Sequence, residues 1–137
     1  MSRRILLAML LALALPLRAE DEEIDLSPPI TVAESWLSLL DAGRYGTAWE
    51  QAAPMFQEAM SRHRWETTLP GARDPLGGTL NRKMRQANLH SSLPNAPPGP
   101  YVVMQFDTRF EQRPLTTEIV TIQRVGERWM VSGYVIR

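Results

Sequence analysis

The stretch that decides the fold is the carboxy-terminal run from Tyr101 to Arg137. It reads YVVMQFDTRF, EQRP, LTTEIVTIQRV, GE and RWMVSGYVIR. The first, third and fifth of these segments are rich in β-branched and aromatic residues, which is the composition of β-strands. The links between them are short, so neighbouring strands should pair antiparallel. The sequence therefore predicts a three-stranded meander at this end of the chain.

Side chains alternate between the two faces of each predicted strand. On the first strand, two phenylalanines mark the face toward the helices, which holds Val102, Met104, Phe106, Thr108 and Phe110. On the last strand, strict alternation opposes two sets, which are Trp129, Val131, Gly133 and Val135 against Met130, Ser132, Tyr134 and Ile136. Both sets contain apolar residues. This favours a curved sheet whose concave side is covered or lines a pocket.

Helical patterns precede the sheet. Thr31 and Glu34 have the spacing of a capping box, and an apolar stripe at helical spacing continues from there to a helix end at Gly43. A second helix is predicted from about Tyr45 to Ala53, where Pro54 either breaks it or begins the next helix.

The middle of the chain carries one more helix and one more strand. Ser61 is a candidate cap for a helix that Pro70-Gly71 breaks or kinks, and residues 79–93 alternate as a strand or long ribbon. Four prolines exclude regular structure from Pro94 to Pro100.

The predicted fold class is α+β, because the helices come first and the strands follow. We expect amino-terminal helices packed on a curved antiparallel sheet of about four strands, in the shape of an open cone. The main anchors of this packing are expected to be the buried tryptophans Trp36, Trp49, Trp65 and Trp129.

The amino terminus has the order of a secretory signal peptide. Ser2-Arg3-Arg4 is basic, Ile5–Leu17 is almost purely apolar, and an acidic run begins at Glu20. The apolar run is shorter than the roughly 20 residues that span a bilayer. We therefore expect cleavage after Ala19, a flexible acidic lead-in over residues 20–30, a single domain over residues 31–137, and a periplasmic or secreted location. An uncleaved amino-terminal anchor is the alternative.

Composition argues against several classes of function. The chain has no cysteine, and hence no disulfide and no thiolate nucleophile or metal ligand. Residues 1–19 hold three of the 15 basic residues and none of the 15 acidic ones, so the remaining chain is slightly acidic. The two histidines, His63 and His90, lie in no metal-binding motif. We expect no metal or other cofactor, no nucleic-acid partner, and no stable membrane insertion after signal cleavage.

Four segments carry a resemblance to a known family. They are WLSLLDAGRYGTAWEQAA (36–53), ARDPLGGTLNRKM (72–84), PYVVMQFDTRFEQR (100–113) and TEIVTIQRVGERWMVSGYVIR (117–137). Together they resemble a family of small exported bacterial proteins catalogued only as a domain of unknown function. More loosely, the helix pair and the meander are similar to the cone-shaped domains of the nuclear transport factor and polyketide-cyclase superfamily. Enzymes of that superfamily typically place an Asp–His pair in the cone, and neither His63 nor His90 matches it.

A set of aromatic residues and two arginines is the candidate ligand site. In this interpretation a pocket is lined by Trp36, Tyr45, Trp49 and Trp65, and its ligand is oriented by Arg73 and Arg82. Aromatic residues at helical spacing more often form a core, and that alternative is the stronger one.

Charged residues suggest two further sites. Asp107 and Glu118, on adjacent predicted strands, could act as acid and base if both point inward. An inward acid is more often paired with an arginine, for which Arg109 and Arg124 are candidates. A basic segment between residues 62 and 85 would suit an acidic partner, lipid head groups or a glycan phosphate; it comprises Arg62, Arg64, Arg73, Arg82, Lys83 and Arg85. A solvated face is the simpler interpretation of that segment.

These observations favour a non-enzymatic exported module that binds an unidentified protein or small molecule at the mouth of the cone. The alternative is a small-molecule enzyme, of isomerase or hydrolase type, that uses an acidic residue in the cone. Pairing of two copies through the convex face of the sheet is a further expectation from the resemblance.

Overall fold

The carboxy-terminal segments form a four-stranded antiparallel sheet in the order β1-β2-β3-β4, in a computed structural model that describes residues 24–137. Each strand pairs with the next one in sequence, as the meander prediction required. The strands are β1 (Thr79–His90), β2 (Tyr101–Phe110), β3 (Arg113–Val125) and β4 (Arg128–Ile136). The predicted signal peptide and the first residues of the acidic lead-in lie outside the described residues.

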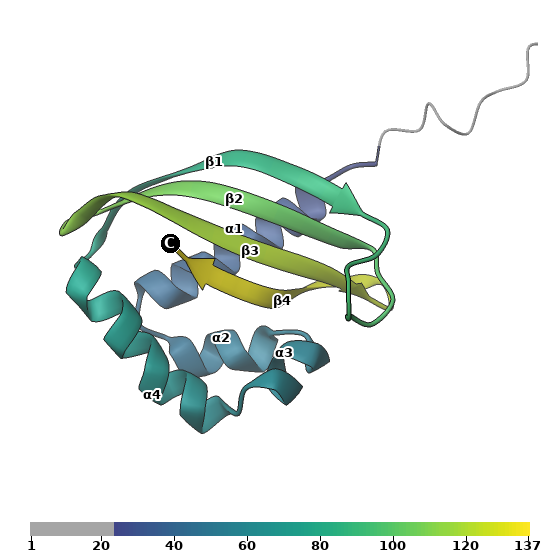
Figure 1. Cartoon of the computed structure of the whole chain (residues 1–137), viewed down its shortest axis with the longest axis horizontal. Coiled ribbons are helices and arrows are strands. Elements are labelled where there is room, and N and C mark those ends of the chain that lie inside the picture. Colours follow the sequence, from purple (N-terminus) through teal and green to yellow (C-terminus); the bar gives the residue numbers. More distant parts are fainter. Residues whose placement is uncertain (1–23) are drawn as a thin grey trace, which may run out of the picture.

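The helices cover one side of the curved sheet (Figure 1). They are α1 (Ser27–Asp41), α2 (Tyr45–Gln51), α3 (Pro54–Ala59) and α4 (Arg62–Arg73), followed by the short 3-10 turn η2 (Asp74–Leu76). Both α1 and α3 pack on β4, while α2 packs between α1 and α4. The expected α+β architecture is therefore confirmed.

The helix starts follow the chemistry of the residues present. Pro54 occupies the first turn of α3, and Ser61 Oγ accepts a hydrogen bond from the Arg64 N–H at 3.2 Å, which caps α4. One prediction was wrong. The first helix begins at Ser27 rather than at a Thr31 capping box, because Pro28 and Pro29 fit its first turn. Of the two outcomes predicted at Pro70-Gly71, the break does not occur, since α4 continues through Pro70 to Arg73.

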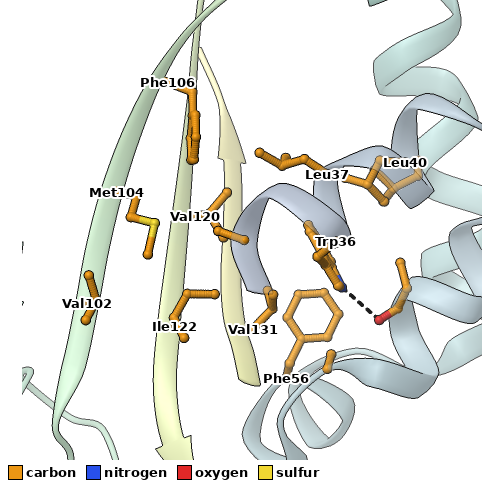
Figure 2. Close-up of a cluster of buried hydrophobic side chains, with 14 of the residues drawn as sticks. Trp36, Leu37, Leu40, Phe56, Val102, Met104, Phe106, Val120, Ile122 and Val131 are labelled. Atoms are coloured by element: carbon orange, nitrogen blue, oxygen red, sulfur yellow. Dashed lines mark hydrogen bonds between the residues drawn. The ribbon is translucent and has the colours of Figure 1, made fainter. Parts of the chain in front are cut away.

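The core fills the space between the helices and the concave face of the sheet (Figure 2). The inward residues of β2 are buried as the alternation predicted, and they are Val102, Met104, Phe106, Thr108 and Phe110. Trp36 belongs to the same core, where its ring packs on Phe56 and Trp65, and it donates from Nε1 to the Ala48 carbonyl at 2.8 Å, the bond drawn dashed in Figure 2. Trp65 is also buried, whereas Trp49 and Trp129 are only partly buried at the edge of the core.

The prediction that side chains alternate strictly along β4 was wrong. The pairing of β3 with β4 shifts by one residue between Thr121 and Ile122, which leaves Ser132 without a partner in the register. A bulge of this kind moves the following side chains to the other face. Val131 is fully buried, and Tyr134 also packs against the core, although alternation had set these two residues on opposite faces.

Candidate functional site

A cluster of two carboxylates, two guanidinium groups and a phenol lies between the helical layer and the sheet. Asp41 ends α1, Arg73 ends α4, Arg82 is on β1, Glu118 is on β3 and Tyr134 is on β4. Five different elements therefore meet in this cluster. Two of its members, Arg73 and Arg82, were candidate ligand-orienting residues in the sequence.

Glu118 is the centre of the cluster and is completely buried. Its Oε1 accepts from Arg82 Nε at 2.8 Å and from the Thr108 hydroxyl at 2.5 Å. Its Oε2 accepts from Arg73 at 3.3 Å and from the Tyr134 hydroxyl. Four donors thus satisfy one carboxylate, which compensates for its removal from water.

Asp41 joins the same two arginines at the outer edge of the cluster. Arg82 binds it in a bidentate manner, with Nη1 to Oδ2 at 2.7 Å and Nη2 to Oδ1 at 2.8 Å. Arg73 Nη2 reaches Oδ1 at 2.7 Å, and the Thr79 hydroxyl donates to the same oxygen at 2.8 Å. The formal charges of the two acids and the two arginines cancel.

The cluster shifts the pKa values of its members. Burial alone would raise the pKa of Asp41, but the hydrogen bonds and charge of Arg82 outweigh it and hold that pKa below its ordinary value. Burial, followed by the charge of Glu118, raises the pKa of Tyr134 well above that of a free phenol. Burial alone would lower the pKa of Arg73 and Arg82, but Tyr134, Glu118 and Asp41 around Arg73, and Asp41 and Glu118 around Arg82, outweigh it and raise the pKa of both arginines, so they stay charged. Asp41, Arg73 and Arg82 therefore keep their charges near neutral pH.

A hollow of about 450 Å³ opens beside this cluster. Its lining includes the side chains of Asp41, Tyr45, Arg73 and Thr79. Burial raises the pKa of Tyr45, and the charge of Arg73, which acts in the opposite direction, does not outweigh it. The Tyr45 hydroxyl therefore keeps its proton. The hollow thus presents a carboxylate, a guanidinium group and two hydroxyls to any molecule that enters it.

The loops that complete the hollow depend on two glycines. Gly43 follows α1 with φ +73° and Gly77 follows η2 with φ +74°, a backbone conformation that suits glycine. The Gly78 N–H donates to Glu111 Oε1 at 2.8 Å, which ties this wall to the β2–β3 hairpin.

The structure separates the tryptophans of the candidate ligand set from the hollow. The indole of Trp65 donates to the Tyr45 carbonyl at 2.8 Å, and that of Trp49 donates to the Met60 carbonyl at 2.8 Å. With the Trp36–Ala48 bond, all three indoles connect the helices to one another. Tyr45 and Arg73 line the hollow, while Arg82 reaches its edge through Asp41.

The proposed acid–base pair is not formed. Glu118 points into the interior, whereas the half-exposed Asp107 pairs with Arg85 at 2.5 Å. The arginines on Glu118 are Arg73 and Arg82 rather than Arg109 or Arg124. Sequence spacing could not find this arrangement, because Arg73 and Glu118 lie 45 positions apart. The available signals were that both arginines belong to the basic segment and were candidates to orient a ligand.

Other candidate chemistries gain no support from the part of the chain that the structure describes. His63 and His90 are exposed on α4 and at the end of β1. Residues 24–137 contain no group of three or more side chains suited to hold a metal ion. Within the same residues, no helix has the length and apolar character needed to cross a membrane.

A family model covers most of this domain. The match extends over residues 32–134 and is described as "Protein of unknown function (DUF4019)". No curated protein and no solved structure matches the chain. The matched range includes α1 from its second turn, β1 to β3, β4 as far as Tyr134, and every member of the charged cluster. The chain belongs to the family of proteins of unknown function described as DUF4019.

Proposed function

We propose that this chain is a non-enzymatic exported binding module that holds a small polar ligand in the hollow beside Asp41 and Arg73. The observation that carries the proposal is the saturation of the charged cluster. Each carboxylate is occupied by arginine and hydroxyl donors, and residues 24–137 contain no buried side-chain polar atom without a partner. A group held in this way positions its neighbours, and it is not poised to exchange protons with a substrate.

The walls of the hollow favour a polar ligand. Asp41 offers carboxylate oxygens as acceptors, Tyr45 offers a hydroxyl donor, and the Thr79 hydroxyl, which donates to Asp41, can still accept. Arg73 contributes positive charge beside them. Because the cluster holds these groups in place before any ligand arrives, little conformational entropy would be lost on binding. Export is proposed from the basic, apolar and acidic order of the first 23 residues.

The enzymatic alternative has less support. An acid that catalyses a reaction must come within hydrogen-bond reach of its substrate. Glu118 is fully buried and does not line the hollow, and Asp41 is held charged by two arginines. Glu118 therefore lacks the open access that a general acid needs, and the pKa of Asp41 is lowered rather than raised.

The proposal can be tested by filling the hollow without touching the cluster. Ala42 lines the hollow and is exposed, so Ala42→Leu should reduce its volume, whereas Ala72→Leu places the same change at an exposed position of α4 outside it. Native mass spectrometry of protein isolated after expression in its own host would detect a co-purifying molecule. We expect an adduct on the wild type and on Ala72→Leu that is lost from Ala42→Leu.

A second measurement covers ligands that dissociate during purification. Amide NMR spectra would be recorded during titration with monosaccharides, amino acids and small carboxylic acids. Shifts around Asp41, Arg73 and Thr79 that vanish in Ala42→Leu would support the hollow as the site. The proposal fails if no adduct and no such shifts occur, and conversion of any probe into a product would favour the enzyme instead.

A further inference from the structure

A second groove lies on the outer, convex side of the sheet, away from the charged cluster. Its volume is about 370 Å³, and its lining comes from one end of β1, β2 and β3. The charged side chains among these residues are Lys83, Arg85, Arg109 and Asp107. Three cations against one carboxylate give the groove a net charge of two positive, in a chain whose formal net charge is zero.

The sheet register explains why these side chains meet. Lys83 lies opposite Asp107, and Asn81 lies opposite Arg109, in the pairing of β1 with β2. Asp107 in turn lies opposite Thr117 of β3. Residues opposite one another in a sheet share a face, so the basic groups of β1 and β2 gather on the face that the helices leave open.

Two of the three cations are available to a partner. Arg85 is committed to Asp107 through a bond at 3.1 Å from Nε to Oδ2 and a second bond from Nη2. Lys83 and Arg109 are exposed, and neither forms an ion pair with any carboxylate of residues 24–137. The groove therefore keeps unneutralised positive charge.

Leu115 stands beside these cations with its side chain in solvent. It lines the groove and is 92 % exposed, the largest exposure among the large hydrophobic residues described. Val135, on β4, is 51 % exposed and lies opposite Ile119 of β3, which shares the outer face with Thr117 of the groove. The outer face thus combines protruding apolar groups with free positive charge.

We propose that this face docks on a lipid bilayer that carries anionic head groups. Lys83 and Arg109 would contact the head groups, while Leu115 enters the apolar boundary beneath them. A soluble anion would explain the cations but not the exposed leucine. Pairing with a second copy through this groove would bring the same unneutralised cations together, which disfavours that occupant. A bilayer satisfies both kinds of group, since cations contact its head groups and apolar side chains reach its acyl region.

Vesicle binding tests this inference directly. The protein would be expressed from the full-length gene, collected after any processing, and characterised by its mass. It would then be sedimented with vesicles of phosphatidylcholine alone or with one third phosphatidylglycerol. We expect binding to the anionic vesicles that is at least tenfold stronger than to phosphatidylcholine, and that weakens as salt is raised. Equal binding to both lipids, or to neither, would overturn the proposal.

Two variants locate the contact, and both change exposed side chains that the fold does not require. Lys83→Gln with Arg109→Gln, and separately Leu115→Ser, should each reduce binding to anionic vesicles at least fivefold. Arg44→Gln with Arg64→Gln removes the same charge from exposed positions elsewhere and should bind as the wild type does. An equal loss of vesicle binding in this control would mean that overall charge explains the effect, and it would overturn the proposed docking surface.

A last experiment distinguishes a bilayer from a soluble anion or a protein as the partner of the groove. Titration with inorganic phosphate should leave the amide signals of Lys83, Arg109 and Leu115 unchanged at millimolar concentration. Saturable shifts there, without binding to vesicles, would assign the groove to a soluble anion instead. Binding to an acidic polypeptide such as polyglutamate, again without binding to vesicles, would assign it to a protein partner.

Discussion

Arg82 on β1 reaches over the intervening strand β2 to Glu118 on β3, with Nε and Oε1 2.8 Å apart. On the way it passes Thr108 of β2, whose hydroxyl donates to the same oxygen at 2.5 Å. Three strands are thus connected by side chains on the inner face as well as by their backbone hydrogen bonds. The helical layer joins this arrangement through Arg73, which binds Glu118 at 3.3 Å.

Replacing Glu118 should therefore be severely destabilising. In Glu118→Gln, two arginines lose a buried charge partner, and one side-chain NH2 faces donors that it cannot satisfy. Breaking a buried ion pair in this way costs about 3–5 kcal/mol. The loss of unfolding free energy can be measured by urea denaturation monitored by tryptophan fluorescence. Glu127→Gln, at an exposed turn, is the matched control and should stay within about 0.5 kcal/mol of the wild type.

The position of a leucine should decide what its truncation costs. Leu37 on α1 is fully buried in the core and Leu115 is 92 % exposed. Leu37→Ala should lower the free energy of unfolding by about 2–5 kcal/mol, because it removes apolar contacts and leaves a cavity. Leu115→Ala is the same chemical change and should cost less than about 0.5 kcal/mol. Similar losses at both sites would contradict the placement of α1 on the sheet.

Acid should weaken the protein partly through Asp41. The pKa of Asp41 is lower in the folded chain than its ordinary value of 3.8. A lowered pKa means that the stabilisation is complete above the pKa of the unfolded state and is lost as the pH falls through the folded value. We expect Asp41→Asn to be less stable than the wild type at pH 7, with the difference shrinking below about pH 4. A difference that stays constant from pH 7 to pH 2 would count against the assignment.

Alkali should act through Tyr134, with the opposite sign. Its pKa is raised in the folded chain by burial and then by the charge of Glu118. The unfolded phenol ionises near pH 10 while the folded one keeps its proton, so stability should fall above about pH 10. In Tyr134→Phe this fall should be shallower, and part of it should remain because the pKa of Tyr45 is raised as well. Unfolding measured between pH 8 and pH 11 tests the difference in slope.

The cap of α4 should make a smaller contribution. Ser61 Oγ accepts from the Arg64 N–H at 3.2 Å, and Ser61→Ala removes that acceptor. Loss of a serine cap costs about 1 kcal/mol. Ser91→Ala, at an exposed position directly after β1, is the control and should change the unfolding free energy by less than half of that. Thermal unfolding followed by circular dichroism is sensitive enough to separate the two variants.

The fold could be predicted from sequence where the signal was local. Alternation from Val102 to Phe110 identified the inner face of β2, and Ser61 identified the start of α4. At Pro70 the sequence left a break and a kink open, and the helix does not break there, because a proline removes one backbone donor without always ending a helix. The bulge at Ser132 has no sequence signature of its own, so the inward turn of Tyr134 could not be predicted.

The candidate site was predictable only in part, for a physical reason. Arg73 and Arg82 were identified as ligand-orienting candidates and as members of the basic segment, but a salt bridge forms between residues that the fold brings together from distant positions. Asp41 looked like the end of a helix, and Glu118 looked like one of two acids on adjacent strands. Their connection required the sheet register and the direction of α4, and neither can be obtained from spacing.

The contact between α1 and β4 sets an order of events for every newly made molecule. The first helix of the domain packs on its last strand as well as on α2 and β3, so the apolar side of α1 stays incompletely covered until β4 has been synthesised. An emerging chain thus lacks a closed interior for almost the whole of its translation. We expect the emerging chain to stay partly unfolded, susceptible to proteases and in need of chaperones until β4 has been synthesised.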